Sequence, residues 1–200
     1  SDLFGGSLAI SGDTAIVGAK QSFMELTGPG SAYVYQRDEG GIDNWGLVTK
    51  ITANDGASGD RFGYSAAISG DRVIVGASGD DDNGEDSGSA YLYQRNGGGV
   101  DNWGQVAKLP ASDGTSADAF GWRVRISGET AIVAANTEGN NGKTGSAYVY
   151  QRDEGGADNW GQVTKITASD GATFDGFGFP VAISGDTAIV GAHGDDDNGE

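Results

Sequence analysis

The stretch "FGYSAAISGDRVIVGA", Phe62–Ala77, decides the fold of this 200-residue chain. Two runs rich in apolar, aromatic and β-branched residues, Phe62–Ser69 and Arg72–Ala77, stand on either side of Gly70 and Asp71. Such runs favour β-strands, and a two-residue connection that contains glycine is typical of a tight antiparallel hairpin. The stretch therefore predicts a β-hairpin. The unbroken apolar run at its end predicts that both faces of the second strand are covered.

This hairpin is the first half of a unit that recurs along the chain. Phe-Gly pairs stand 58, 58 and 57 residues apart, beginning at Phe4, Phe62, Phe120 and Phe177. In the second unit, "SAYLYQR" (Ser89–Arg95) and "WGQVAKL" (Trp103–Leu109) follow the hairpin as two further strand candidates. Gly, Asp and Asn occupy the junctions, and no stretch has convincing helical periodicity. Each unit is thus predicted to be a four-stranded antiparallel sheet.

The units must stack, because an isolated four-stranded sheet cannot cover two apolar faces. The stretch "SAYVYQ" alternates, with Tyr33 and Tyr35 on one face and Ala32 and Val34 on the other. A β-solenoid normally has shorter coils, and a β-sandwich does not repeat so strictly. The sequence therefore predicts an all-β fold, a β-propeller of four-stranded antiparallel blades.

We expect residues 1–200 to be a propeller fragment with three full blades and the first half of a fourth. The expected repeat boundaries are residues 4–61, 62–119, 120–176 and, incomplete, 177–200. Closed propellers typically have four to eight blades. We therefore expect an arc of a larger propeller, whose remaining blades come from the parent chain or from self-association.

Phe-Gly followed by Gly-Ala about 14 residues later resembles the FG-GAP repeat. This repeat is the blade unit of the integrin α-subunit propeller and of many bacterial secreted and surface proteins. The matching pairs are Phe4-Gly5 with Gly18-Ala19, Phe62-Gly63 with Gly76-Ala77, and Phe177-Gly178 with Gly191-Ala192. In the third unit Ala134-Ala135 stands in place of Gly-Ala. The resemblance covers the chain and implies a seven-bladed propeller outside the cell or on its surface.

One feature of the family is missing from this chain. Family members that bind calcium carry an aspartate-rich loop between the two halves of the motif. Here the interval is only "SGDT", "SGDR" or "SGET", a tight turn with one acidic residue. The resemblance therefore implies no calcium role for Asp13, Asp71, Glu129 or Asp186.

The loop between the second and third strands varies most among the units. It reads "GDDDNGE" in the second unit (Gly79–Glu85) and again at Gly194–Glu200. Calcium is coordinated by six to eight oxygens on a flexible turn, and an extended start of the loop would aim alternate carboxylates the same way. We predict a calcium site from Asp80, Asp82, Asn83 and Asp86, and an incomplete second one from Asp195, Asp197 and Asn198. The alternative is an exposed turn whose charges are solvated, and the spacing is not that of an EF-hand.

The charge balance restricts the partners. The chain has 29 acidic and 12 basic residues and a net charge of −17. Such a surface repels nucleic acid and anionic membranes, whereas cations and basic protein surfaces are better partners. Solubility alone is the other interpretation of the charge. The chain has no cysteine, and no apolar run approaches the roughly 18 residues of a membrane helix.

Other chemistry-bearing residues favour structural roles. His193 is the only histidine and, without cysteine, cannot anchor a zinc site. Tryptophans that begin the fourth strand of each unit, Trp45, Trp103 and Trp160, favour packing between blades over a sugar-stacking platform. Aspartates at recurring turn positions are expected to cap turns through backbone amides, namely Asp55, Asp60, Asp113, Asp118, Asp170 and Asp175. No pair of carboxylates stands out as a glycosidase site.

Together these patterns predict a non-catalytic extracellular binding or adhesion module stabilised by calcium. It would recognise a protein or glycan ligand through its variable inter-strand loops, since loops on a rigid scaffold carry most recognition. Two alternatives stay open at this point. One is a lectin-like propeller that binds carbohydrate, and the other is an accessory propeller of a secreted enzyme.

Overall fold

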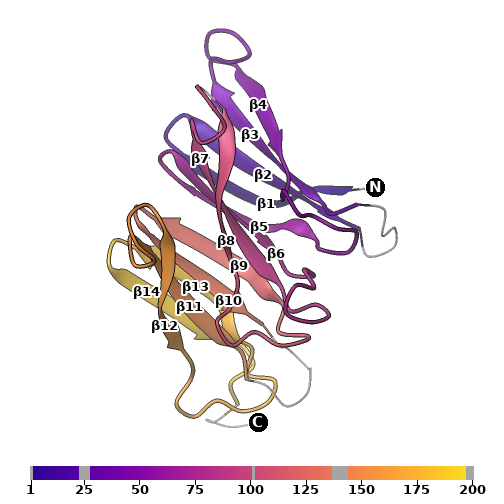
Figure 1. Ribbon diagram of the computed structural model, residues 1–200, viewed down its shortest axis with the longest axis vertical. Helices are drawn as coiled ribbons and strands as arrows, with labels where there is room; N and C mark the ends of the chain where they lie inside the picture. Colours follow the sequence, from indigo (N-terminus) through magenta and orange to yellow (C-terminus); the bar gives the residue numbers. More distant parts are fainter. Residues whose placement is uncertain (1, 23–27, 101, 137–143, 197–200) are drawn as a thin grey trace.

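The chain folds into a row of antiparallel sheets (Figure 1). The computed structural model describes residues 2–22, 28–100, 102–136 and 144–196. Within them, three sheets have four strands each and one has two, and the strands of every sheet follow chain order. The prediction of three blades and half of a fourth is confirmed.

The strands are β1 Asp2–Ser11, β2 Thr14–Gln21, β3 Ser31–Arg37, β4 Trp45–Ile51, β5 Phe62–Ser69, β6 Arg72–Ala77, β7 Ser89–Arg95, β8 Trp103–Leu109, β9 Phe120–Ser127, β10 Thr130–Ala135, β11 Ser146–Arg152, β12 Trp160–Ile166, β13 Phe177–Ser184 and β14 Thr187–Ala192. In the second blade all four strands begin and end at the predicted residues. The Gly70-Asp71 connection is the predicted hairpin, with Ser69 paired to Arg72 and Gly70 at a φ of 55°. Residues with a side chain rarely adopt a positive φ, whereas glycine adopts it freely.

Hydrophobic cores lie between successive sheets. Between the first two, Ile16, Ala32 and Val34 of the first sheet pack against Phe62 and Tyr91 of the second. The other face of the second sheet, with Ile74 and Leu92, packs against the third in the same way. Strand β6 is therefore buried on both faces, as its apolar run predicted. The first strands of neighbouring blades lie side by side, while the fourth strands are spread apart (Figure 1).

Aromatic rings of the first and third strands meet on one face of the second and third sheets. Phe62 lies edge-on to Tyr91 and Tyr93, with ring centroids 5.6 and 6.0 Å apart. The Tyr93 hydroxyl then donates to Thr52 O of the preceding blade at 2.7 Å. The third blade repeats this arrangement, because the Tyr150 hydroxyl donates to Pro110 O at 2.5 Å. The tyrosines thus contribute apolar area to the core and a hydrogen bond across the blade boundary.

The backbones of adjacent blades approach very closely at the motif glycines. A methyl group on Gly76 would lie 1.9 Å from Gly121 O of the next blade, and one on Gly18 would lie 2.2 Å from Gly63 O. Only glycine fits at such a distance. The Phe-Gly of one blade and the Gly-Ala of the preceding blade are therefore two halves of one contact.

The third blade shows what happens when this glycine is replaced. Ala134 occupies the position, and the next blade lies farther away there. A methyl group on Gly178 would be 3.0 Å from Ser146 O, compared with 2.2 and 2.3 Å for the equivalent contacts of Gly63 and Gly121. The fourth sheet therefore accommodates the extra methyl group by shifting, which explains the loss of the motif in this unit.

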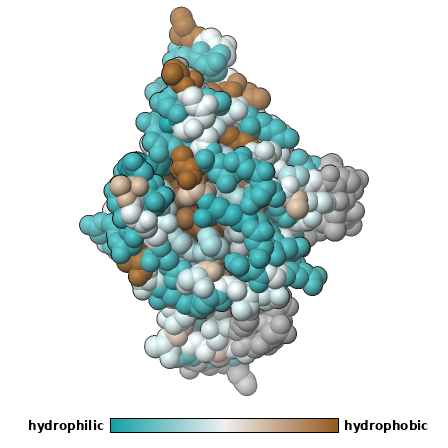
Figure 2. Space-filling view, viewed as in Figure 1, coloured by the Kyte–Doolittle hydropathy of each residue, from teal (hydrophilic) through white to brown (hydrophobic). Residues whose placement is uncertain are grey.

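The outer face of the first sheet lacks the cover that its equivalents have. Phe4 is 59% exposed, whereas Phe62 and Phe120 are fully buried, and Leu8 and Ile10 on the same strand are also exposed. Elsewhere the visible surface is mostly hydrophilic, with scattered apolar spots (Figure 2). The apolar face of β1 therefore has the composition of a blade interface.

Replacing Gly76 by alanine is expected to destabilise the fold. The added methyl group would force the second and third blades apart, and overpacking of this kind costs about 1–3 kcal/mol in the free energy of unfolding. Urea denaturation of wild type and variant measures the loss. Gly28→Ala is the matched control, because a methyl group there meets no atom within 4 Å. Equal stability of the two variants would contradict the proposed role of the close approach.

Candidate functional site: the acidic rim

The stretch predicted as a cation site forms the loop between β6 and β7, residues 78–88. It packs on connections that lead into two blades. Gly79 N donates to Asp60 O at 3.0 Å in the connection into its own blade, and Ala117 N donates to Glu85 O at 2.7 Å from the connection into the next. We call these three segments the acidic rim, residues 52–61, 78–88 and 110–119.

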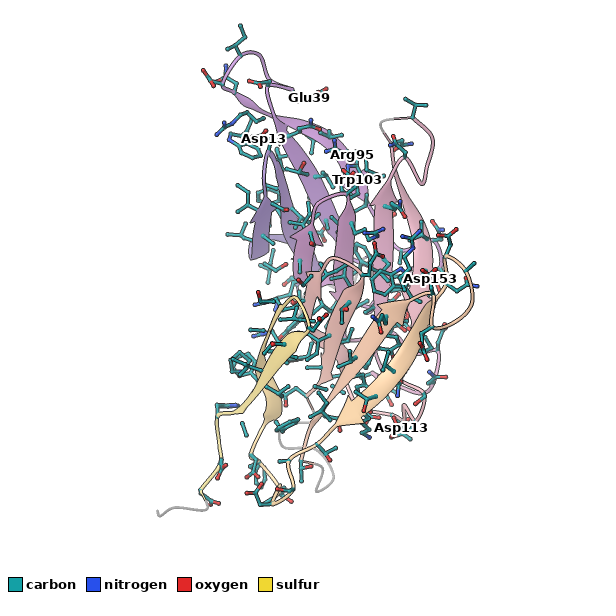
Figure 3. All side chains as sticks on the ribbon, turned by 90° about the vertical axis from the view of Figure 1, so that its left-hand side faces the viewer. Asp13, Glu39, Arg95, Trp103, Asp113 and Asp153 are labelled. Atoms are coloured by element: carbon teal, nitrogen blue, oxygen red, sulfur yellow. The ribbon has the colours of Figure 1, made fainter. Side chains whose placement is uncertain are left out.

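The acidic rim occupies one end of the sheets. Asp113 lies at this end, whereas Asp13 and Glu39 lie at the other (Figure 3). The three segments contain nine acidic residues and one basic residue, Arg61. The acidic rim is thus strongly negative.

Asp80 anchors the loop through a buried carboxylate, since the residue is only 3% exposed. Its Oδ1 accepts a hydrogen bond from Ser89 Oγ at 2.9 Å, and its Oδ2 accepts one from the Tyr91 hydroxyl at 2.7 Å. Burial and the nearby Asp80 charge raise the pKa of Tyr91, so the hydroxyl stays protonated and remains a donor. A buried carboxylate requires such donors, because it would otherwise lose its hydration without compensation.

Lys108 of β8 brings a positive charge to the centre of three carboxylates. Its Nζ lies 2.8 Å from Asp55 Oδ2, 3.0 Å from Asp80 Oδ2 and 2.5 Å from Asp82 Oδ2. Burial alone would lower the pKa of Lys108, but its hydrogen bonds to the carboxylates outweigh burial and raise the pKa. The ammonium is therefore charged at neutral pH. We call these four side chains the Lys108 cluster.

The Lys108 cluster could hold a metal ion. Oxygens of Asp55, Asp80 and Asp82 all lie within 4.8 Å of one another. Carboxylate oxygens are the ligands that hard cations such as calcium prefer. The ammonium lies within hydrogen-bonding distance of all three, so a metal ion would have to replace it. One ammonium against three carboxylates also leaves net negative charge to attract a cation.

The third blade contains the framework of this cluster without the acidic loop. Lys165 Nζ lies 2.6 Å from Asp113 Oδ2, and the Tyr148 hydroxyl donates to Asp113 Oδ1 at 2.9 Å. The hydrogen bond from Lys165 lowers the pKa of Asp113. A lysine–aspartate pair across the blade boundary is therefore part of the repeat, and Asp80 and Asp82 are additions in the second blade.

The structure brings together only some of the predicted ligands. Asp80 and Asp82 lie in the cluster, whereas Asn83 N donates to Ser87 Oγ at 3.2 Å and Asp86 forms an ion pair with Arg61 at 3.1 Å. In the last copy of the loop, Asp195 is exposed. Asp197 and Asn198 lie outside the described residues. The predicted calcium ligation by these residues stays a prediction.

Sequence reasoning missed Asp55 and Lys108 as members of the cluster. Both recur once per unit, the lysine near the end of the fourth strand and the aspartate in the connection that follows, and this recurrence was the available signal.

The expected turn caps are confirmed at the aspartates that precede Phe-Gly. Asp60, Asp118 and Asp175 accept hydrogen bonds from the amides of Ala57, Thr115 and Ala172, respectively, at 2.6–2.7 Å.

The remaining candidates have structural roles. Trp103 is 5% exposed in the core between the first two blades, which confirms the packing interpretation for this residue. The acids of the first three β-hairpin turns are engaged in ion pairs, Asp13 with Arg37, Asp71 with Arg95 and Glu129 with Arg72. A two-residue turn with one ion-paired acid does not fit the calcium loop of the family.

Within the described ranges, no helix is long and apolar enough to cross a membrane. No curated protein matches the chain. Among solved structures, it is similar to a mutant of the Bombyx mori GH32 beta-fructofuranosidase BmSUC1 in complex with sucrose, with a TM-score of 0.45 and 14% sequence identity. The alignment covers 94% of this chain and 43% of that chain, so the present chain spans less than half of its length. A similarity of this strength carries no argument about activity.

The family model of the FG-GAP repeat matches residues 1–35, 45–93, 103–150 and 160–200. The second and third of these segments each contain the fourth strand of one blade and the first three strands of the next. In these two segments the sequence unit of the family model is therefore offset by one strand from the sheets, and each of the two segments runs from one blade into the next. On these matches, which extend over most of its length, the chain belongs to the FG-GAP repeat family.

Proposed function

We propose that this chain is a non-catalytic extracellular module that binds a protein or glycan ligand through the acidic rim. One observation carries the proposal: hydrogen bonds hold the base of loop 78–88 while three of its acidic side chains are exposed. Asp80 is buried in hydrogen bonds, whereas Asp81, Asp82 and Glu85 are exposed. A preorganised loop loses little conformational entropy on binding, which favours recognition.

The charge of the rim indicates the kind of ligand. Acidic side chains on a fixed frame complement a basic surface and steer its approach. A net charge of −17 disfavours nucleic acid and anionic membranes. Membership of the FG-GAP family supports a location outside the cell or on its surface, with adhesion as the role. Further blades, from a longer parent chain or from another copy, would cover the apolar face of β1.

Neutralising the exposed rim is expected to weaken ligand binding at least tenfold. The variant is Asp81→Asn/Glu85→Gln, which leaves the Lys108 cluster intact. Biolayer interferometry against a panel of basic extracellular matrix proteins and a glycan array would identify a ligand and measure its affinity. The matched control is Asp153→Asn/Glu154→Gln in the turn between β11 and β12, at the other end of the sheets. A ligand whose affinity changes equally with both variants, or with neither, would refute the proposal.

We also infer that calcium can replace the Lys108 ammonium between Asp55, Asp80 and Asp82. The three carboxylates already converge, and the ammonium marks where they hold positive charge. The remaining ligands would come from water and loop carbonyls, because calcium takes six to eight oxygens. In wild type, the ammonium competes with calcium.

Removing the competing charge by Lys108→Met is expected to raise calcium affinity at least tenfold over wild type, as measured by calorimetry. Asp80→Asn added to that variant should abolish the binding heat. Lys165→Met is the control, because among the described residues the Lys165 ammonium pairs with one carboxylate, that of Asp113, in place of three. If folded Lys108→Met shows no more calcium binding than Lys165→Met, the rim acts without calcium.

Charge crowding at the rim also predicts a pH dependence. Burial, together with the Asp80 and Asp81 charges, raises the pKa of Asp60 to about 6. The pKa of Asp60 is higher in the folded chain than in the unfolded chain, so protonation of this carboxyl favours the folded state. This contribution to the free energy of unfolding is complete below pH 4 and is lost as pH rises through about 6. Relative to Asp60→Asn, wild type should lose on the order of 2 kcal/mol in unfolding free energy between pH 4 and pH 7.5. Urea denaturation at both pH values tests this, with Asp118→Asn as the equivalent variant one blade away. If wild type and Asp60→Asn differ in unfolding free energy by the same amount at both pH values, the proposed effect of the raised Asp60 pKa on stability is wrong.

A further inference from the structure

A second charged region lies on the first strands of the blades, away from the acidic rim. A pocket of about 280 Å³ opens where β1, β5 and β9 lie side by side (Figure 1). Its polar lining comes from Ser7 of β1, Lys20 of β2, Tyr64 of β5, and Arg123 and Arg125 of β9. We call it the basic pocket.

The basic pocket concentrates positive charge in a strongly acidic chain. Among the described residues, three cations and no acidic residue line it, although the chain carries −17. Burial, then the charges of Arg123 and Arg61, lowers the pKa of Lys20. Burial also lowers the pKa of Arg123, with a further contribution from Arg125. Like charges are therefore held together at an electrostatic cost, which an anion between them would relieve.

Aromatic rings hold two of these cations in place. Lys20 Nζ lies 4.0 Å from the centroid of the Tyr64 ring, which itself stacks on Trp122 at 4.4 Å. Arg123 Cζ lies 4.3 Å from the ring centroid of Phe179. A cation–π contact positions a cation without adding a negative charge. These aromatic contacts therefore do not themselves offset the positive charge of the pocket, in contrast to the three carboxylates around Lys108.

The two guanidinium groups are oriented by their own strand. Arg123 Nη1 donates to Trp122 O at 2.9 Å, and Arg125 Nη1 donates to Val124 O at 2.8 Å. Arg123 is also hydrogen-bonded to Tyr64. A guanidinium has five N–H donors, more than these bonds use. Planar guanidinium groups fixed in this way suit bidentate hydrogen bonds to an oxyanion.

The repeats supply an internal comparison. At the position of Arg123 the first two blades have Ser7 and Ser65, each of which hydrogen-bonds the next blade. At the position of Arg125 they have Ala9 and Ala67. The propeller framework therefore does not need either arginine. Residues that break a repeat and replace a structural hydrogen bond indicate a local function.

We propose that the basic pocket binds a small ligand through an oxyanion, a carboxylate or a phosphate, held by Lys20, Arg123 and Arg125. The pocket volume lies just below the range of sites for drug-sized ligands, which suits a single acidic sugar or a phosphorylated small molecule. Ser65 Oγ accepts its hydrogen bond from Val124 N, so the Ser65 hydroxyl can donate to the ligand beside the cations. The site shares no residue with the acidic rim, so either can fail without the other.

Calorimetry of the chain with glucuronate, inorganic phosphate and neutral glucose at low ionic strength tests this proposal. The variant Arg123→Ser/Arg125→Ala restores the residues that the second blade carries, so it is compatible with the fold. We expect glucuronate or phosphate to bind wild type, glucose not to bind, and the variant to lose at least tenfold in affinity. The tighter of the two anions identifies the group that the pocket prefers.

The control variant Arg37→Ala/Arg152→Ala removes two positive charges elsewhere, at residues paired with Asp13 and Glu129. It should bind the anion as wild type does. Failure of both anions to bind wild type would overturn the proposal. The proposal would also be wrong if Arg123→Ser/Arg125→Ala bound the anion with wild-type affinity. An equal loss of affinity in the control variant would overturn it too, because it would show a general effect of net charge.

Discussion

The structure depends on the very close approach of two backbones at the blade boundaries. Gly76 of one blade and Gly121 of the next leave no space for a side chain between them. Close approach brings the apolar faces of neighbouring sheets into contact, so the cores lie between blades instead of inside any one of them. Burial of these faces is the main stabilising contribution. The tyrosine hydroxyls that reach the preceding blade add hydrogen bonds to the same boundary.

The Lys108 cluster lies at the boundary between the first and second blades. Its lysine stands on the last strand of the second blade, and Asp55 stands in the segment that leaves the first. The equivalent pair Lys165–Asp113 shows that the repeat provides this ion pair by default. The acidic loop adds two more carboxylates to an existing cation, and Asp80 gains buried hydrogen-bond donors from Ser89 and Tyr91. A structural contact of the propeller thus becomes the foundation of a rigid, negatively charged rim.

The sites that we propose lie where the sequence departs from the repeat. The acidic loop occurs in the second unit and again in the fourth but not in the first and third, and the third blade departs in Arg123 and Arg125. These departures create surfaces of opposite sign, an acidic rim at one end of the sheets and a basic pocket on the first strands. Because the blades are otherwise alike, an unaltered neighbour shows in each case what the framework alone requires.

The sequence by itself determined the strands, the turns and the faces. The limits of β5–β8, the Gly70 turn, the opposite faces of Tyr33 and Ala32, and the Asp60 cap all follow from patterns within a few residues. The tertiary structure alone decided which side chains meet across a blade boundary. It placed Lys108 among the predicted carboxylates, brought Asp55 from the preceding blade, and turned Asp86 away to Arg61. Local patterns cannot determine such neighbours, because these depend on how closely and at what angle two sheets pack, and the backbone contact at the glycines sets that distance.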